Sequence, residues 1–156
     1  MADASASRSA SPTGMRPFDQ SLPMALLRAR EAVMRGFRRL LRAHDLNEQE
    51  WRIMRALVEA GRLEIGELAG RVFILKPSAT RTVKNLEMRG IVSRSRPSSD
   101  QRRALIALTP KGRALFEQLA PHSEQEYARI TEIIGAGDMD QLYRLLGRIT
   151  GALNRS

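Results

Sequence analysis

The chain contains no cysteine, which excludes disulfide bonds, thiolate metal sites and cysteine-based redox sensing. Its two histidines, His44 and His122, are far apart in the sequence and argue against a zinc enzyme. Aromatic residues make up only 4% of the chain, whereas hydrophobic residues make up 42%, so the core must consist mostly of Leu, Ile, Val, Ala and Met. This composition suits helices packed on helices better than a β-sandwich.

Long apolar runs are missing as well. No segment approaches the length that crosses a bilayer, and the N-terminal segment lacks the apolar stretch of a signal peptide. The bias of residues 1–19 toward Ala, Ser, Pro and Gly predicts a disordered tail. We therefore expect a cytoplasmic protein that does not bind a membrane.

The sequence also lacks the residue groupings of common catalytic sites. It has no glycine loop that could cradle a phosphate, no cluster of metal ligands, and no converging set of acid, base and nucleophile. We therefore do not expect an enzyme, and we expect neither a cofactor nor a metal ion.

Positive charge is in excess, and it is concentrated in one segment. The net charge is +9 over 156 residues. Residues 71–113 contain eleven Lys and Arg residues but only two acidic residues, Glu87 and Asp100, so this segment accounts for the whole excess. A solvated run of surface charge is the simplest alternative, but it rarely gathers the imbalance of an entire protein. The pattern favours a nucleic acid or another polyanion as the partner.

Hydrophobic periodicity predicts a mainly helical chain with one β-hairpin. Apolar residues at helical spacing predict a first helix over residues 22–43, and Asn47 with Glu50 forms a capping box for a second helix that ends at Gly61. The remaining predicted elements are an apolar bridge at 63–65, a short helix through 67–72, a helix over 77–90, strands over 91–96 and 104–108 joined by a basic tip, a helix over 110–134, and a last helix starting at Asp138 and ending near Leu153.

A short helix followed by an exposed polar helix and a basic hairpin is the element order of a winged helix-turn-helix. At these elements the sequence resembles the MarR family of bacterial transcriptional regulators. Residues 100–112 fit the wing signature of that family: D-x-R, five residues, L-T, two residues, G. The helix-turn-helix of the family is matched at 68–69, 77–81, 86–87 and 90–92. The resemblance covers roughly residues 22–155 and implies a winged helix-turn-helix fold, mainly α with a small β-hairpin wing.

The helix that begins near Pro77 is the expected reader of DNA. Its N-terminal half offers short donors and cations suited to the major groove, and the hairpin adds cations suited to phosphates or the minor groove. The candidate DNA-binding residues are Lys76, Pro77, Ser78, Thr80, Arg81 and Lys84 in the helix, and Arg94, Arg96, Asp100, Arg102 and Arg103 in the hairpin. Asp100 either fixes an arginine through a salt bridge or only shapes the turn. Lys84 stands where the family usually has an acidic residue, which puts operator preference in doubt.

The resemblance further implies a homodimer in which the first helix and the last two helices of two copies interlock. The last helix carries an apolar stripe that one small lobe could hardly cover: Leu142, Leu145, Leu146, Ile149 and Leu153. After the tail we therefore expect a dimerisation helix over 20–46, a DNA-binding lobe over 47–109 and C-terminal dimerisation helices over 110–156. Two recognition helices about one duplex turn apart would fit a palindromic operator.

Residues 26–32 and 46–53 resemble one subgroup of the family, the regulators of homoprotocatechuate degradation. That resemblance implies a repressor of a catabolic operon that a small aromatic carboxylate releases from DNA. The candidate effector-binding residues are Arg30, His44, Trp51 and Arg52. A cation on an apolar helix seam can bind the carboxylate of such an effector, and an indole can stack on its ring. Each residue also has an ordinary structural explanation. Arg30 could pair with a carboxylate of the chain and His44 could lie at a helix end. Trp51 could belong to the core, and Arg52 could face solvent.

Other functions stay open on sequence alone. A nonspecific architectural DNA-binding protein would tolerate the basic lobe, but it needs neither the seam residues nor a wing of this length. An RNA-binding or protein-interaction module is disfavoured because the chain has few aromatic residues for base stacking. The sequence fixes neither the operator, nor the choice between repression and activation, nor the effector among hydroxylated phenylacetates, benzoates, cinnamates and nicotinates.

Overall fold

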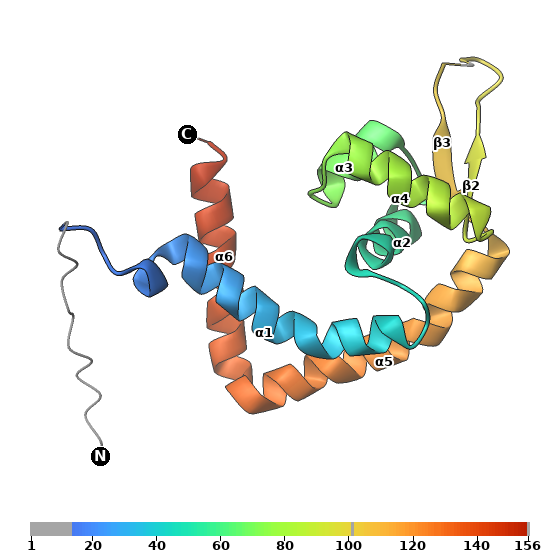
Figure 1. The fold of residues 1–156 in the computed structure, drawn as a ribbon. Helices are drawn as coiled ribbons and strands as arrows, with labels where there is room; N and C mark the ends of the chain where they lie inside the picture. The colour runs from blue at the N-terminus through green and yellow to red at the C-terminus, as the bar shows by residue number, and fades with distance from the viewer. Residues whose placement is uncertain (1–13, 101, 156) are drawn as a thin grey trace. The chain divides into compact units, whose positions relative to one another are not determined.

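A computed structural model describes residues 14–100 and 102–155 (Figure 1). The chain divides into two compact units, Met1–Gly36 and Phe37–Ser156, and each is described by itself. Most of the predicted tail, residues 1–13, lies outside the described residues. The elements are η1 (Phe18–Gln20), α1 (Leu22–Arg42), α2 (Glu48–Ala60), β1 (Arg62–Glu64), α3 (Ile65–Arg71), α4 (Lys76–Met88), β2 (Val92–Ser95), β3 (Leu105–Leu108), α5 (Pro110–Ile134) and α6 (Ala136–Leu153).

The first unit holds the short 3-10 helix η1 and most of α1. The Ser21 hydroxyl donates a hydrogen bond to the carbonyl of Phe18 at 2.9 Å, which closes the turn between the two helices. Arg28 pairs with Asp19 at 3.3 Å. The predicted first helix is confirmed, and several of its apolar residues are exposed: Leu22, Leu26, Leu27 and Val33.

The second unit is built around α2, whose predicted capping box is confirmed. The Asn47 side chain accepts the N–H of Glu50 at 3.0 Å, and the Glu50 carboxylate accepts the N–H of Asn47 at 2.9 Å. Gly61 ends the helix with φ of +77°, a conformation that glycine adopts without strain. The buried residues of α2 supply a large part of the core: Trp51, Ile53, Met54, Ala56 and Leu57.

Helices α3 and α4 form the predicted helix-turn-helix. Helix α3 begins after Glu64, whose N–H donates to the Glu67 carboxylate at 3.0 Å in a second capping box. Helix α4 has Pro77 in its first turn, where a missing N–H costs nothing. Figure 1 shows α4 running from α3 to the foot of β2, with the β2–β3 hairpin projecting beyond it.

The predicted hairpin is part of a larger sheet. Strands β2 and β3 pair antiparallel, with Val92 opposite Leu108, and the short strand β1 pairs with the other edge of β3 through Leu63 and Ile106. The sheet order is therefore β1-β3-β2. The sequence indicated only an apolar bridge where β1 lies, because a strand of three residues is too short to show alternation.

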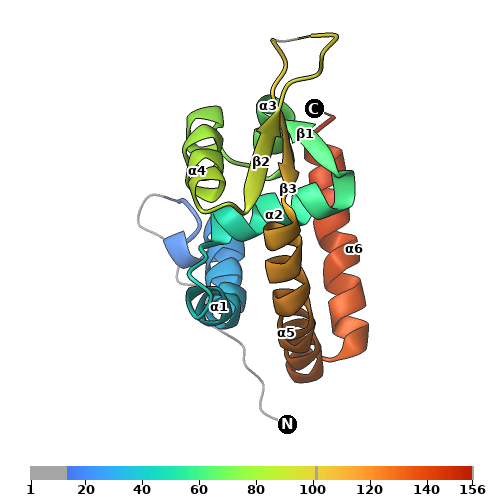
Figure 2. The same cartoon turned by 90° about the vertical axis from the view of Figure 1, so that its right-hand side faces the viewer.

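The C-terminal helices differ from the prediction at one end. Helix α5 begins after Thr109, whose side chain accepts the N–H of Gly112 at 3.0 Å, and Figure 2 shows α6 turning back from the end of α5. The predicted start of the last helix at Asp138 is wrong. The chain reverses at Gly135, where φ is +98°, and α6 begins at Ala136, so Asp138 lies in the first turn. None of the helices in the described ranges is long and apolar enough to cross a membrane.

Candidate DNA interface and ligand site

The outer side of α4 carries polar and cationic side chains. Lys76, Pro77, Thr80, Arg81 and Lys84 are exposed, and Ser78 is half-buried. The Thr80 hydroxyl donates to the carbonyl of Lys76 at 2.9 Å, which orients that side chain along the helix. The opposite side of α4 is fully buried through Ala79, Val83 and Leu86. The helix therefore presents a cationic surface from a firmly packed base.

A buried carboxylate holds the C-terminal half of α4. Glu50 of α2 is only 2% exposed, and its Oε1 accepts hydrogen bonds from Asn85 at 2.7 Å and from Arg89 at 3.1 Å. The same Arg89 donates to the carbonyl of Asp45 at 2.8 Å. These charge-assisted bonds fix the orientation of α4 relative to the start of α2. The sequence indicated Glu50 only as a capping residue.

Two of the predicted wing arginines are held by carboxylates of the lobe. Arg94 pairs with Glu87 at 3.6 Å, and the Arg103 side chain donates to Glu64. The hydrogen bond that Arg103 donates to Glu64, together with the negative charge of Glu64, raises the pKa of Arg103 above its ordinary value. These two pairs connect the base of the wing to α4 and to the start of α3.

The tip of the wing is shaped by Asp100. Its Oδ1 accepts the backbone N–H of Arg102 at 3.0 Å, which is the geometry of a turn-forming aspartate. The turn-shaping alternative for Asp100 is thus the one that its hydrogen bond supports. Arg96 and Arg102 are exposed on the two sides of this tip.

The four predicted effector-binding residues make separate contacts, each within its own unit. Trp51 is buried and stacks on Phe116 with ring centroids 5.1 Å apart. Arg52 donates from Nη1 to the carbonyl of Val72 at 2.7 Å, and its buried Nε has no hydrogen-bond partner within residues 14–100 and 102–155. His44 Nδ1 lies 3.1 Å from the carbonyl of Leu40. Arg30 belongs to the first unit, where it is exposed and pairs with Glu31 at 3.0 Å.

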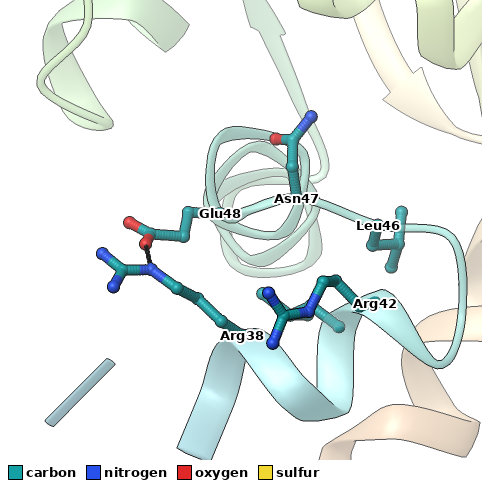
Figure 3. A pocket seen from close by; sticks show the side chains of 6 residues that line it. Arg38, Arg42, Leu46, Asn47 and Glu48 are labelled. Atoms are coloured by element: carbon teal, nitrogen blue, oxygen red, sulfur yellow. Dashed lines mark hydrogen bonds and ion pairs between the residues drawn. The ribbon is translucent and has the colours of Figure 1, made fainter. Parts of the chain in front are cut away.

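A cavity of about 240 Å³ lies between the end of α1 and the start of α2 (Figure 3). Its buried floor contains Leu41 and Leu46. Figure 3 shows Arg38 paired with Glu48 and, apart from that pair, the side chain of Arg42. Two arginines against one carboxylate give the lining a positive balance, which suits a small anion with an apolar body.

One cation suited to a carboxylate was missed by the sequence reasoning. Arg55 of α2 is half-buried and donates to the Tyr127 hydroxyl at 2.9 Å. The Tyr127 ring packs on Phe37 with centroids 4.8 Å apart. Among the described residues, no carboxylate pairs with Arg55. Phe37, Arg55 and Tyr127 are called the arginine–aromatic cluster below. The sequence signal that could have indicated Arg55 is its spacing, because it follows Trp51 by four residues and so lies on the same face of α2.

Comparison with known proteins agrees with this geometry. The sequence profile of the MarR family matches residues 46–104. The homoprotocatechuate degradative operon repressor of Escherichia coli is 42% identical over 126 residues, covering 81% of this chain and 85% of that protein. The chain belongs to the MarR family of transcriptional regulators.

Two solved structures of regulators are similar to this chain in fold and sequence. The crystal structure of NadR in complex with 4-hydroxyphenylacetate has a TM-score of 0.73 and 37% identity, covering 86% of this chain and 96% of NadR. The transcriptional repressor CouR, bound to a 23-mer DNA duplex, has a TM-score of 0.78 and 28% identity, covering 85% of this chain and 94% of CouR.

The wing signature of this MarR-family chain has a clear structural role. The Thr109 N–H donates to the carbonyl of Ile91 at 3.1 Å, and its hydroxyl donates to the carbonyl of Gly90 at 2.6 Å. The signature residues therefore join the end of the hairpin to the end of α4 and to the first turn of α5, while Asp100 shapes the tip.

Proposed function

We propose that this MarR-family regulator is a cytoplasmic, homodimeric repressor of a catabolic operon that a small aromatic carboxylate releases from a palindromic operator. Its parts are a dimerisation helix over 20–46, a DNA-binding lobe over 47–109 and C-terminal dimerisation helices over 110–156. The observation that carries the proposal is the cationic outer side of α4, held on a buried base next to a basic wing. A helix with one cationic exposed side and one buried side, next to a basic wing, suits insertion into the major groove.

The proposed DNA contacts divide between base reading and positioning. Arg81 and Lys84, with Ser78 and Thr80, offer donors to base edges, while Lys76 and the N-terminal turn around Pro77 suit a phosphate. Arg94, Arg96, Arg102 and Arg103 of the wing are all exposed, and we assign Arg96 and Arg102, on the two sides of the tip, to the DNA backbone or the minor groove. Arg94 and Arg103 orient the wing through their ion pairs with the lobe, and Asp100 shapes its tip. The structural neighbour CouR was solved bound to a DNA duplex, which supports DNA as the partner of this surface.

The dimer proposal rests on apolar surface that the single chain leaves exposed. Helix α6 buries none of its residues, although Leu142, Leu145 and Leu153 are large and apolar. Exposed apolar stripes of this size are typical of helices that pack on a partner. A second copy of the chain supplies such a partner and places two α4 helices on one duplex.

The effector proposal rests on Arg55. A half-buried guanidinium without a carboxylate partner favours an anionic ligand, and the rings of Phe37 and Tyr127 suit an aromatic body. NadR was crystallised with 4-hydroxyphenylacetate, and the relative in Escherichia coli represses homoprotocatechuate degradation. Trp51 and Arg52 then act as supports on the same helix, while Arg30 in α1 and His44 in the turn that follows α1 stay proposed contacts.

Replacing Arg81 with alanine is expected to weaken operator binding about tenfold or more, because the side chain provides a bidentate donor on the exposed side of α4. Fluorescence anisotropy on the chain's own promoter region and on a scrambled duplex, at one salt concentration, measures this. Arg148→Ala, an exposed arginine of α6, serves as the control and should bind normally. Equal binding of the wild type to both duplexes would instead support the architectural alternative.

Replacing Arg55 with alanine is expected to leave DNA binding intact and to raise the concentration of 4-hydroxyphenylacetate needed for release at least about tenfold, since one charged hydrogen bond is lost. The measurement is titration of the acid into the preformed operator complex. Arg42→Ala, at the cavity between the end of α1 and the start of α2, should leave release unchanged. If Arg42→Ala shifts release and Arg55→Ala does not, the effector site is the cavity of Figure 3 and the cluster assignment is wrong.

A further inference from the structure

Two large apolar side chains are exposed at the turn between α3 and α4. Phe73 is 85% exposed and Leu75 is 77% exposed, whereas their neighbours Val72 and Ile74 pack into or against the core. Phe73 and Leu75 are called the apolar tip. Inward and outward side chains thus alternate through the turn, and the apolar tip points away from the lobe.

The backbone of the turn maintains this exposure. Phe73 has φ of +54°, a conformation that bulky residues rarely adopt. The N–H of Phe73 donates to the carbonyl of Gly70 at 3.3 Å, and the N–H of Ile74 donates to the carbonyl of Ala69 at 3.1 Å. A strained backbone that holds a large apolar side chain in solvent is of no benefit to the isolated lobe. It is better explained by a partner that covers the tip.

The charge around the apolar tip favours DNA as the partner. Leu75 is the N-cap of α4, directly before Lys76 and one turn before Ala79 and Thr80. No acidic residue occurs from Leu68 to Leu86, whereas Arg71, Lys76, Arg81 and Lys84 lie in that range. The tip is therefore continuous with the proposed DNA interface and sits at the end of α4 that meets the groove first.

The chemistry of the groove shows what the tip can read. The polar side chains in the N-terminal half of α4, such as Lys76, Ser78 and Arg81, donate hydrogen bonds and so recognise acceptors on base edges. The C5 methyl group of thymine is the one apolar feature of the major groove, and a donor cannot recognise it. An apolar side chain at the start of the recognition helix can do so.

We propose that the apolar tip, through Leu75 above all, contacts thymine C5 methyl groups in the operator and contributes to its sequence specificity. The proposal rests on the proposed function, since it requires a specific operator complex. It adds an apolar readout to the polar contacts of α4 and gives the strained turn at Phe73 a role in recognition.

A cycle of protein and DNA changes tests the proposal. Thymines of the footprinted operator are replaced by deoxyuridine, one position in one half-site at a time, and the dissociation constants of the wild type and of Leu75→Ala are measured on each duplex. At one or more positions the wild type should lose about fourfold in affinity, the effect of leaving one methyl group uncovered. Leu75→Ala should bind the thymine operator more weakly and should no longer distinguish thymine from deoxyuridine there.

Two further variants make the outcome specific. Met88→Ala removes an apolar side chain that is 79% exposed at the other end of α4, and it should keep the wild-type ratio between the two duplexes. Leu75→Met keeps an apolar side chain and should restore that ratio. The proposal is overturned if the wild type is indifferent to every thymine methyl group, or if Leu75→Ala keeps the wild-type ratio at every position. Failure of the proposed function is separate, because the wild type would then bind promoter and scrambled DNA alike.

Discussion

Replacing Gly112 with alanine is expected to lower the free energy of unfolding by more than about 4 kcal/mol, which is the upper end of single-substitution effects. A Cβ atom at this position would lie far closer than 3.0 Å to the carbonyl oxygen of Ile91, 3.0 Å from its carbonyl carbon and 3.1 Å from a methyl carbon of Leu108. The obstacle at Ile91 is backbone, so it cannot rotate away as a flexible side chain could.

The close approach at Gly112 follows from the hydrogen bonds of Thr109. The threonine binds the carbonyls of Gly90 and Ile91 and caps the first turn of α5 through the N–H of Gly112. These bonds press the first turn of α5 onto the backbone just before the start of β2, so only a residue without a side chain fits. The spacing L-T, two residues, G in the wing signature is therefore a packing requirement.

Gly66→Ala is the matched control for Gly112→Ala. Gly66 lies in α3, and a Cβ atom there would meet nothing within 4 Å, so the variant should be as stable as the wild type or more stable by about 0.5–1 kcal/mol. Urea titration followed by circular dichroism, at one fixed protein concentration because the chain is a proposed dimer, measures both variants. An unfolding midpoint of Gly112→Ala equal to that of the wild type would contradict the predicted clash.

The long helices were predictable because their signals are local. Apolar spacing, the Asn47 capping box, Pro77 in a first turn and Gly61 at a helix end all act within a few residues, and each is found in the structure. Strand β1 was not predictable from its own residues, since it exists through its pairing with β3, more than 40 residues later in the chain. The start of α6 was misjudged because a positive φ at Gly135 decides it, whereas Asp138 only looked like a cap.

The proposed DNA interface was more predictable than the proposed ligand site. Exposure of Arg81 and Lys84 follows from the amphipathic pattern of one helix. The choice between Arg52 and Arg55 depends on distant contacts: Arg52 is occupied by the carbonyl of Val72, and Arg55 meets a hydroxyl at Tyr127. Such partners, 20 and 72 residues away, leave no trace in the local sequence.

Arg103 shows the same limit within the wing. Its charge predicted a DNA contact, but its side chain pairs with Glu64, a residue of β1 that the sequence had not placed beside the hairpin. The wing is therefore oriented by an ion pair whose acidic partner lies outside the basic segment 71–113. The count of charges predicts the segment that meets DNA, whereas tertiary contacts such as the pair of Arg103 with Glu64 decide how its individual side chains are oriented.

Replacing Glu50 with alanine is expected to cost about 3–5 kcal/mol of unfolding free energy, because it leaves a partly buried guanidinium without its carboxylate. Glu50 is buried and serves three donors: the N–H of Asn47, the side-chain amide of Asn85 and the guanidinium of Arg89. Its loss removes a capping bond and both side-chain bonds that join α2 to the end of α4. Urea titration at fixed protein concentration gives the value.

An exposed ion pair is the matched control for Glu50→Ala. Glu59 pairs with Arg71 at 2.9 Å, with both side chains about half exposed, so Glu59→Ala should cost less than about 1 kcal/mol. A double variant separates the ion pair from the cap: Glu50→Ala with Arg89→Ala should cost less than the sum of the two single changes, because the second change removes the stranded charge. Strict additivity would show that Glu50 does not hold α4 through Arg89, which would leave the helix cap and the bond from Asn85 as its contributions.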